Sequence, residues 1–140
     1  MKKTIITLSL ALIFLFNVAA LAQSFNFVSP PDFKQWLEAD RPMIIVDIQE
    51  KKSFSKQHFR GSIETNAFPV KTDAEKKSLD PAVAQFKATG HDVIVVCPRG
   101  GGGAKRCYNY LKLQGVLEEK LFILQGGIDK WPHREMLISR

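Results

Sequence analysis

A cysteine, a run of glycines and several cations occur together near the middle of the chain. Cys97 is followed by Pro98, Arg99 and four consecutive glycines, Gly100 to Gly103. Glycine loses more backbone entropy on folding than any other residue, so four in a row call for a steric reason. One such reason is a loop that curls with its amides facing a single atom. The pattern therefore predicts a nucleophilic cysteine in an anion-binding loop.

Regular elements are expected on both sides of this loop. The unbroken β-branched run at 93–96 predicts a strand buried on both faces, and residues 104–113 predict a helix that stops near Gly115. A thiol between a strand end and a helix start lies where unpaired amides and the helix dipole favour negative charge. That position predicts a lowered pKa for Cys97. The alternative is a small buried cysteine that precedes a flexible linker.

The loop also predicts which residues hold an anionic substrate. Its amides from Arg99 to Ala104 are expected to face the bound group, and Arg99 is the cation nearest to the cysteine, with Lys105 or Arg106 as further candidates. The predicted site thus has Cys97 as the catalytic residue and Arg99, Gly100, Gly101, Gly102, Gly103, Ala104 and Lys105 as substrate-binding residues. No metal is expected, because His58 has no cysteine or carboxylate ligand at metal spacing.

The chain has two cysteines, too few for a disulfide-rich scaffold. If Cys97 ends a strand and Cys107 lies about a turn into the helix, their side chains do not meet at disulfide geometry. Cys107 is therefore expected in the core. A role as a resolving thiol is the alternative.

Strands and helices are expected to alternate along the rest of the chain. Strands are predicted at 24–28, 43–48, 62–66 and 121–124, and helices after Ser29, over 50–58 and from Asp80 to Gly90. Residues 71–78 are expected to form a charged loop or a loose helical turn, and a short helix is expected after Gly127. This alternation predicts an α/β domain with a mainly parallel sheet and a site at its carboxyl edge.

The first 22 residues have the pattern of a cleaved signal peptide. Lys2 and Lys3 precede a mostly apolar stretch at 5–16, and Ala20-Leu21-Ala22 supplies a small-x-small cleavage pattern. Cleavage would leave residues 23–140 as one domain. A bacterial periplasmic location is the expectation, with secretion as the alternative. An uncleaved anchor is less favoured, because the run from 5 to 22 contains Asn17 and just reaches spanning length.

The formal net charge is +6, and it falls when Lys2 and Lys3 are removed. The remaining charges are scattered along the chain rather than clustered. An exported protein seldom meets nucleic acid, so small anions or acidic surfaces are the better partners.

Three segments in order resemble the single-domain rhodanese family of sulfurtransferases. Residues 44–66 are similar to its strand, aspartate and "H-x-x-G-[AS]-I" segment, with Asp47 and His58 at the matching positions. The Cys97 loop is the second segment, and Gly126 to Pro132 resembles the closing G-G-x-x-x-W element. The resemblance implies a single rhodanese-like domain with a mainly parallel central sheet and helices on both faces.

The resemblance also implies an activity. Cys97 would take sulfane sulfur from a small anionic donor such as thiosulfate, form a persulfide, and pass the sulfur to cyanide or a thiol, a protein thiol included. No metal or organic cofactor is implied. Asp47 and His58 would be scaffold residues.

The loop departs from the family pattern in two ways. Relatives usually carry a cationic or polar residue where this chain has glycines 101–103, and the loop is one residue longer than the common six. That length approaches phosphatase-like relatives, which end the loop with an arginine where Gly103 stands. Three alternatives therefore stay open: a partner-dependent sulfur carrier, less favoured a phosphatase or arsenate-reductase-like enzyme, and least favoured thiol–disulfide exchange between Cys97 and Cys107.

Overall fold

A computed structural model describes residues 23–140. The predicted signal peptide, residues 1–22, lies outside the described residues. In the described part of the chain, no helix is both long enough and apolar enough to cross a membrane.

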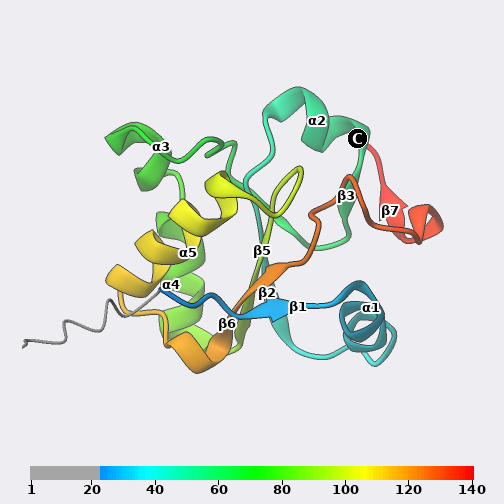
Figure 1. Ribbon diagram of the computed structural model, residues 1–140, viewed down its shortest axis with the longest axis horizontal. Helices are drawn as coiled ribbons and strands as arrows, with labels where there is room; N and C mark the ends of the chain where they lie inside the picture. Colours follow the sequence, from blue (N-terminus) through cyan, green and yellow to red (C-terminus); the bar gives the residue numbers. More distant parts are fainter. Residues whose placement is uncertain (1–22) are drawn as a thin grey trace, which may run out of the picture.

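A five-stranded parallel sheet forms the centre of the protein (Figure 1). Its strands, in spatial order, are β1 (Phe27–Val28), β6 (Leu121–Leu124), β5 (Asp92–Val96), β2 (Met43–Asp47) and β4 (Ile63–Glu64). β5 lies in the middle and pairs with β2 along the whole length of both strands. All five residues of β5 are buried, as its run of β-branched residues predicted. The sequence-based α/β assignment is confirmed.

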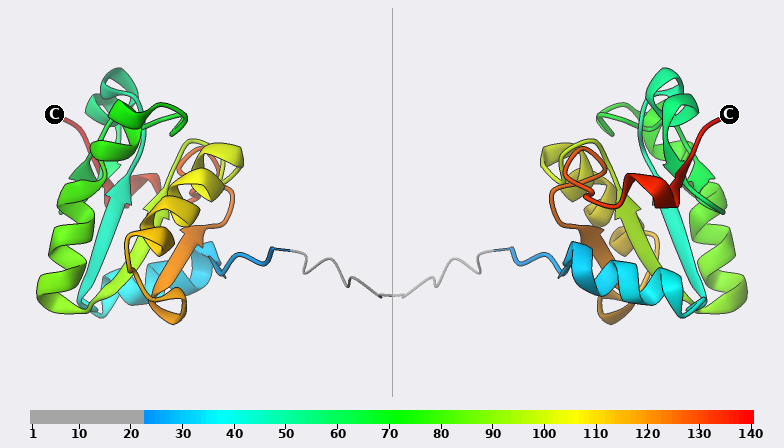
Figure 2. Two further views of the ribbon diagram at one scale, coloured as in Figure 1. Left: turned by 90° about the vertical axis from the view of Figure 1, so that its left-hand side faces the viewer. Right: turned by 90° about the vertical axis from the view of Figure 1, so that its right-hand side faces the viewer.

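Helices cover both faces of the sheet. Figure 2 shows α4 (Asp80–Thr89) and α5 (Gly102–Leu113) on one side and α1 (Pro30–Glu38) on the other. The Ser29 side chain accepts a hydrogen bond from the Asp32 amide and caps α1, and Gly90 ends α4 in the left-handed conformation. The short helices α2 (Lys51–Lys56) and α3 (Asp73–Lys77) follow β2 and β4.

Of two local predictions, one is refined and the other is wrong. At residues 73–77 the helical alternative is present as the short helix α3, because Thr72 and Glu75 make a reciprocal capping box that satisfies its first amides. No helix follows Gly127, since the amides of Ile128 and Asp129 bond to carbonyls of the Cys97 loop rather than to a helical turn.

The end of the chain contains structure that the sequence did not predict. β3 (His58–Phe59) pairs antiparallel with β7 (Leu137–Ile138) in a second, two-stranded sheet. Short 3₁₀ turns, η1 (Glu118–Lys120) and η2 (Arg134–Met136), precede β6 and β7. This pairing fastens the chain's last residues next to the segment that leads out of α2.

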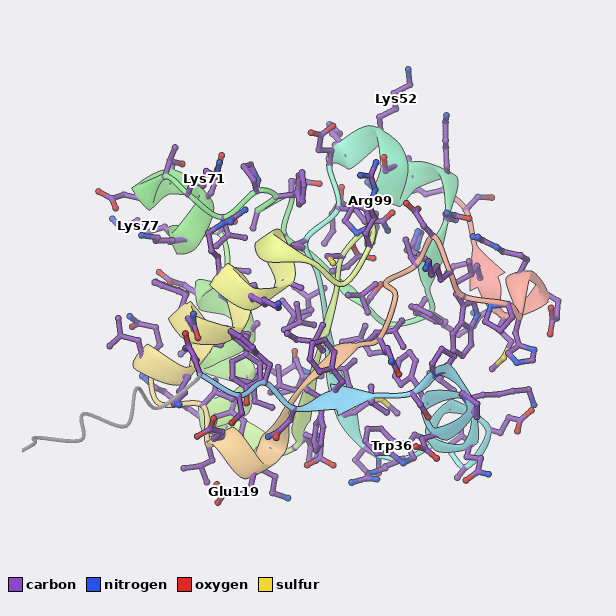
Figure 3. All side chains as sticks on the ribbon, viewed as in Figure 1. Trp36, Lys52, Lys71, Lys77, Arg99 and Glu119 are labelled. Carbon is purple, nitrogen blue, oxygen red and sulfur yellow. The ribbon has the colours of Figure 1, made fainter. Side chains whose placement is uncertain are left out.

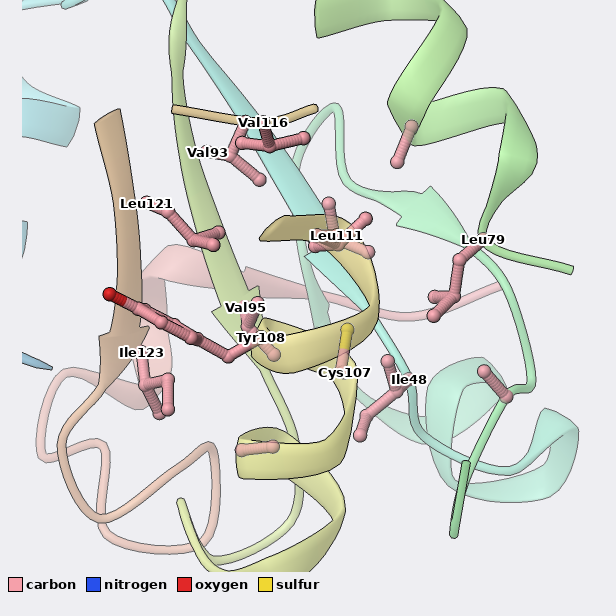
Figure 4. Packing of buried hydrophobic residues seen from close by; sticks show 14 of the residues in the cluster. Ile48, Leu79, Val93, Val95, Cys107, Tyr108, Leu111, Val116, Leu121 and Ile123 are labelled. Atoms are coloured by element: carbon pink, nitrogen blue, oxygen red, sulfur yellow. The ribbon is translucent and has the colours of Figure 1, made fainter. Parts of the chain in front are cut away.

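The core has two layers, one on each face of the sheet. Tyr108, Leu111 and Cys107 of α5 pack over the strands on one face, and Figure 4 shows this layer. On the other face Phe33, Phe59 and Trp131 meet edge to face. Because the buried strand β5 is clamped from both sides and ends at Val96, the residue after it is held in a fixed place.

Candidate active site

Cys97 lies where β5 ends and its loop turns back into α5. The Gly100 amide donates a hydrogen bond to the Cys97 Sγ over 2.7 Å. Gly100 has φ +70°, a conformation that glycine adopts without the steric cost of a Cβ. α5 begins at Gly102, two residues before the predicted start, so part of the glycine run forms its first turn. The predicted curled loop around the sulfur is therefore present.

The turn at Gly126 and Gly127 packs against the Cys97 loop and fixes its backbone. The Ile128 amide donates to the Cys97 carbonyl over 2.9 Å, and the Asp129 amide donates to the Pro98 carbonyl over 3.0 Å. A Cβ on Gly127 would lie 2.4 Å from the Cys97 carbonyl oxygen, a distance that no packed atom tolerates. Only a residue without a side chain allows the two backbones to approach this closely.

At Gly103 the Phe68 side chain, rather than backbone, leaves no room for a Cβ. A Cβ there would lie 2.8 Å from the Phe68 ring, and Phe68 itself packs against the core. Gly101, by contrast, has no heavy atom within 4 Å of its Cβ position. An arginine at 103, the position that ends the loop in phosphatase-like relatives, would require Phe68 to move.

The Cys97 thiol opens onto a cavity of about 690 Å³. The cavity is lined by Glu50, Ser53, Phe68, Cys97, Pro98, Arg99, Gly101, Gly102, Gly103 and Arg106. It thus brings together Cys97 and four of the predicted substrate-binding residues. Gly100, Ala104 and Lys105 do not line it, although the first two place their amides toward the sulfur.

Besides Pro98, four residues that line the cavity are not in the predicted set of site residues. Three of them were not predicted at all, and the fourth, Arg106, was named as a further candidate cation. Glu50 and Ser53 come from the start of α2, and Phe68 from the loop after β4. Arg106 was a further candidate, and it proves to be an anchored one. Its Nε donates to the Pro69 carbonyl over 2.9 Å, and its Nη1 would lie 3.1 Å from a Cβ on Gly102. The absence of a side chain at 102 leaves room for this guanidinium beside the start of α5.

The other two cations, Arg99 and Lys105, have different surroundings from Arg106. The Arg99 side chain is 88% exposed, and its Nε is 4.0 Å from the Asp129 carboxylate (Figure 3). The Lys105 amine lies over the Phe25 ring, 5.5 Å from its centre, and does not line the cavity. Arg99 and Arg106 are therefore the cations that a group bound at Cys97 would meet.

Burial raises the pKa of the Cys97 thiol above its ordinary value. The amides of Gly100, Arg99, Gly101 and Ala104 act in the opposite direction, because they stabilise the thiolate. The predicted lowering of the pKa is thus wrong in sign. Cys97 is 2% exposed, the Arg99 side chain lies in solvent and the Lys105 amine lies over Phe25, so desolvation of the thiolate outweighs the amides.

Cys107 lies in the core and both cysteines are free. It is fully buried among apolar side chains under α5, and burial, followed by the charge of Cys97, raises its pKa strongly. The placement agrees with the predicted core role.

Asp47 and His58 are buried side chains that stabilise the backbone next to the site. Asp47 accepts hydrogen bonds from the Gln49 amide and side chain, each at 2.9 Å, and burial raises its pKa to about 6. These bonds fix the turn that leads from β2 to α2 and hence the position of Glu50. His58 stacks on Phe54 and its Nδ1 lies 2.7 Å from the Phe54 carbonyl. Neither side chain lines the Cys97 cavity.

No cluster of three metal-ligating side chains occurs among residues 23–140. The polar groups that line the cavity are backbone groups, two guanidinium groups, one carboxylate, one hydroxyl and one thiol. This set can bind an anion next to a sulfur nucleophile.

Solved structures with this fold carry several activities in their descriptions. The As-Sb reductase from Leishmania major superposes with a TM-score of 0.66 at 11% identity, covering 84% of this chain and 87% of that one. A rhodanese-like domain protein from Staphylococcus aureus has a TM-score of 0.62 at 18% identity, with 83% and 99% covered. A thiosulfate sulfurtransferase from Pseudomonas aeruginosa has a TM-score of 0.60 at 15% identity over 83% of this chain and 20% of that longer one.

These likenesses establish the fold and leave the chemistry open. No curated protein sequence matches the chain significantly. The rhodanese-like domain model matches residues 29–133, a stretch that contains the Cys97 loop, the Gly126-Gly127 turn and every strand of the parallel sheet except β1. The chain therefore belongs to the rhodanese-like domain family.

Proposed function

We propose that the protein is a sulfurtransferase that carries sulfane sulfur as a persulfide on Cys97. The observation that carries this proposal is the geometry at the sulfur: Sγ accepts the Gly100 amide at 2.7 Å while facing a cavity of about 690 Å³. Backbone amides that surround a sulfur atom stabilise a terminal anion on it as oxyanion-binding donors stabilise developing charge. A persulfide is such an anion.

The loading step needs no oxidant. The Cys97 thiolate attacks the sulfane sulfur of thiosulfate, the sulfur–sulfur bond of thiosulfate breaks, and its electron pair leaves with sulfite. Cys97 then carries the outer sulfur as a persulfide anion. In the second step an acceptor, cyanide or a thiolate, attacks that outer sulfur, and the electron pair of the breaking bond returns to the Cys97 Sγ.

Arg106 and the loop amides would bind the anionic donor. The Arg106 Nε is held by the Pro69 carbonyl, so its remaining N–H groups are positioned with less freedom than those of the exposed Arg99. The glycine-lined wall of the cavity leaves the space that the donor occupies. Arg106 thereby supplies the cation that the glycine run itself lacks.

Phosphate or arsenate chemistry is the weaker candidate. It would use a loop-terminal arginine to hold a tetrahedral anion, and the Phe68 ring occupies the space next to Gly103 where such a side chain would begin. A sulfur carrier that works with one partner protein is the stronger alternative, because Cys97 could load as described and yet transfer slowly to small acceptors.

We also propose, from the sequence alone, that the protein is exported. The lysines and apolar stretch before Gln23 would direct the chain across a membrane, and the domain would then act in the bacterial periplasm.

The experiment is turnover with thiosulfate and cyanide, followed as sulfite and thiocyanate formation. The wild type and Cys107→Ser should turn over, and Cys97→Ser should form neither product. Turnover by Cys97→Ser would contradict the proposal. Loading of one sulfur without turnover would favour the carrier, and hydrolysis of a phosphate ester or reduction of arsenate without sulfur loading would favour the phosphate-type chemistry.

A further inference from the structure

A second hollow adjoins the Cys97 cavity. It lies between α3 and α5, measures about 360 Å³, and has Val70, Tyr110 and Leu113 among its apolar walls. Lys71, Lys76 and Arg106 also line it, and we call it the lysine groove. Arg106 lines both hollows, so the lysine groove and the Cys97 cavity adjoin at this side chain.

The cations of this groove have no carboxylate partner. Within residues 23–140, none of the side chains of Lys71, Lys76 and Arg106 lies within ion-pair distance of an acidic group, and no acidic residue lines the groove. The nearby Glu75 carboxylate accepts bonds from the amides of Lys71 and Thr72. The Glu75 carboxylate also interacts electrostatically with Lys71, but the three cations outnumber it, and the net positive potential beside the groove favours an anionic ligand.

A second carboxylate of this region is also occupied. Asp80 accepts a hydrogen bond from the Tyr110 hydroxyl over 2.9 Å, which leaves the tyrosine ring to form the wall of the groove. Lys77 of α3 adds a cation nearby, in a hollow that Lys76, Tyr110 and the acidic Asp73 also line. Figure 3 shows Lys71 and Lys77 at the same end of the molecule as Arg99, whereas Glu119 lies at the opposite end.

The two hollows offer more space than a small donor needs. A cavity of about 690 Å³ falls in the range that holds drug-sized ligands, and thiosulfate has just five heavy atoms. The lysine groove adds an apolar floor, which small inorganic anions do not use. A ligand that fills both hollows has a reactive sulfur at one end and an extended chain with acidic and apolar groups beyond it.

We propose that the lysine groove binds an acidic peptide segment of a protein thiol acceptor, whose cysteine enters the Cys97 cavity. This inference rests on the proposed function and assigns the class of its acceptor. The acceptor thiolate attacks the outer sulfur of the Cys97 persulfide, the bond between the two sulfurs breaks, and the electron pair returns to Sγ. The acceptor leaves as the persulfide, and charge and atoms balance without another reactant.

Binding can be tested apart from sulfur chemistry. A fluorescent peptide with one cysteine flanked by two glutamates on each side is titrated against the Cys97→Ser protein, next to the same peptide with glutamines. The acidic peptide should bind about tenfold more tightly, and this preference should shrink with added salt. Lys71→Glu/Lys76→Glu should remove most of it. Lys52→Glu/Lys87→Glu, the same charge change at exposed lysines that line neither hollow, should leave it in place.

Sulfur transfer supplies the second arm. After loading with thiosulfate, the otherwise wild-type enzyme should transfer sulfur to the acidic peptide faster than to the glutamine peptide. Lys71→Glu/Lys76→Glu should lose that preference while its loading and its transfer to 2-mercaptoethanol stay unchanged. Normal loading and transfer to the neutral thiol would show that this variant is folded.

Each outcome decides one of the two proposals. Equal binding of both peptides, or unchanged binding by Lys71→Glu/Lys76→Glu, would overturn the assignment of the groove. A small thiol with two carboxylates that matches the acidic peptide in both arms would overturn the protein acceptor. Failure of Cys97 to load from thiosulfate would count against the proposed function, and the binding arm would still decide what the groove holds.

Discussion

Cys97 and Cys107 have the same side chain and nearly the same burial, yet their surroundings differ completely. Their exposed fractions are 2% and 0%, and burial raises the pKa of both thiols. Cys97 accepts a backbone amide and opens onto a cavity, whereas Cys107 faces apolar side chains under α5. The exposed fraction and the direction of the pKa shift therefore do not distinguish a nucleophilic cysteine from a packing cysteine in this protein. The two cysteines are distinguished by the polar backbone groups around the sulfur and by the cavity next to it.

The two cysteines also differ in what holds them. Cys107 is fixed by the phase of α5 alone, since any residue on that face of the helix reaches the core. The position of Cys97 depends on backbone that is distant in the sequence, because Gly127 packs against its carbonyl and the Ile128 amide donates a hydrogen bond to that carbonyl. A packing position is defined locally, and a reactive one is defined by long-range contacts.

The largest expected difference is in alkylation. Iodoacetamide should modify native protein at Cys97 and not at Cys107, which becomes reactive on unfolding, so the two rates should differ about a thousandfold or more. Cys107→Ser should keep the fast reaction, and Cys97→Ser should show labelling only in denaturant. Labelling of both sites at similar rates in the native protein would erase the distinction drawn above. Mass spectrometry of the digested protein gives the measurement.

A second substitution tests the remote support of Cys97. Gly127→Ala would place a Cβ 2.4 Å from the Cys97 carbonyl oxygen, so the loop must shift, and sulfur loading should fall about 100-fold. Gly90→Ala is the matched control, because its φ of +66° is close to the +64° of Gly127 but its Cβ meets no atom within 4 Å. The control should lose about 1–2 kcal/mol of stability and keep its loading rate. Equal loading rates in the two variants would show that the turn does not position the nucleophile.

The pH dependence tests how burial and amides combine at Cys97. Because burial raises the pKa of this thiol, the thiolate is the minor form at neutral pH, and loading should increase about tenfold per pH unit. The increase should continue past about 8.5, the pKa of an ordinary cysteine. The rate of loading is measured from sulfite release in single-turnover reactions. A plateau below that pH would mean that the loop amides outweigh burial.

The smallest expected effect separates two neighbouring cations. Arg106→Gln should raise the KM for thiosulfate about fivefold with little change in kcat, because it removes one charge from the cavity wall. Lys105→Gln should leave both constants unchanged, since its amine lies over Phe25 outside the cavity. Steady-state sulfite release supplies both constants. The reverse pattern would restore Lys105 to the predicted substrate-binding set and remove Arg106.

Local signals predicted most of the fold. The β-branched run of β5, the Ser29 cap of α1 and the Gly90 stop of α4 each depend on neighbours in the sequence, and each is present in the structure. The pairing of β3 with β7 joins short segments far apart in the chain, which have no distinctive pattern. No local signal marks it.

The site was predicted in part. Cys97 and the curled glycine loop follow from residue types in order, and the contact of Gly127 with that loop does not. Lys105 and Arg106 are adjacent, so they point about 100° apart on a helix, and which one faces the cavity depends on the exact phase of α5. The pKa direction was missed because desolvation depends on packing that a sequence does not display.

The most direct test is to locate the added sulfur in the wild-type protein. Residues 23–140 are incubated with thiosulfate, measured as intact protein with and without reductant, and then digested to assign the modified peptide. We expect a gain of one sulfur atom that reductant removes, on the peptide that contains Cys97, with Cys107 unmodified. A gain on Cys107, or no gain at all under conditions where the protein is folded, would contradict the assignment of Cys97 as the persulfide-forming nucleophile.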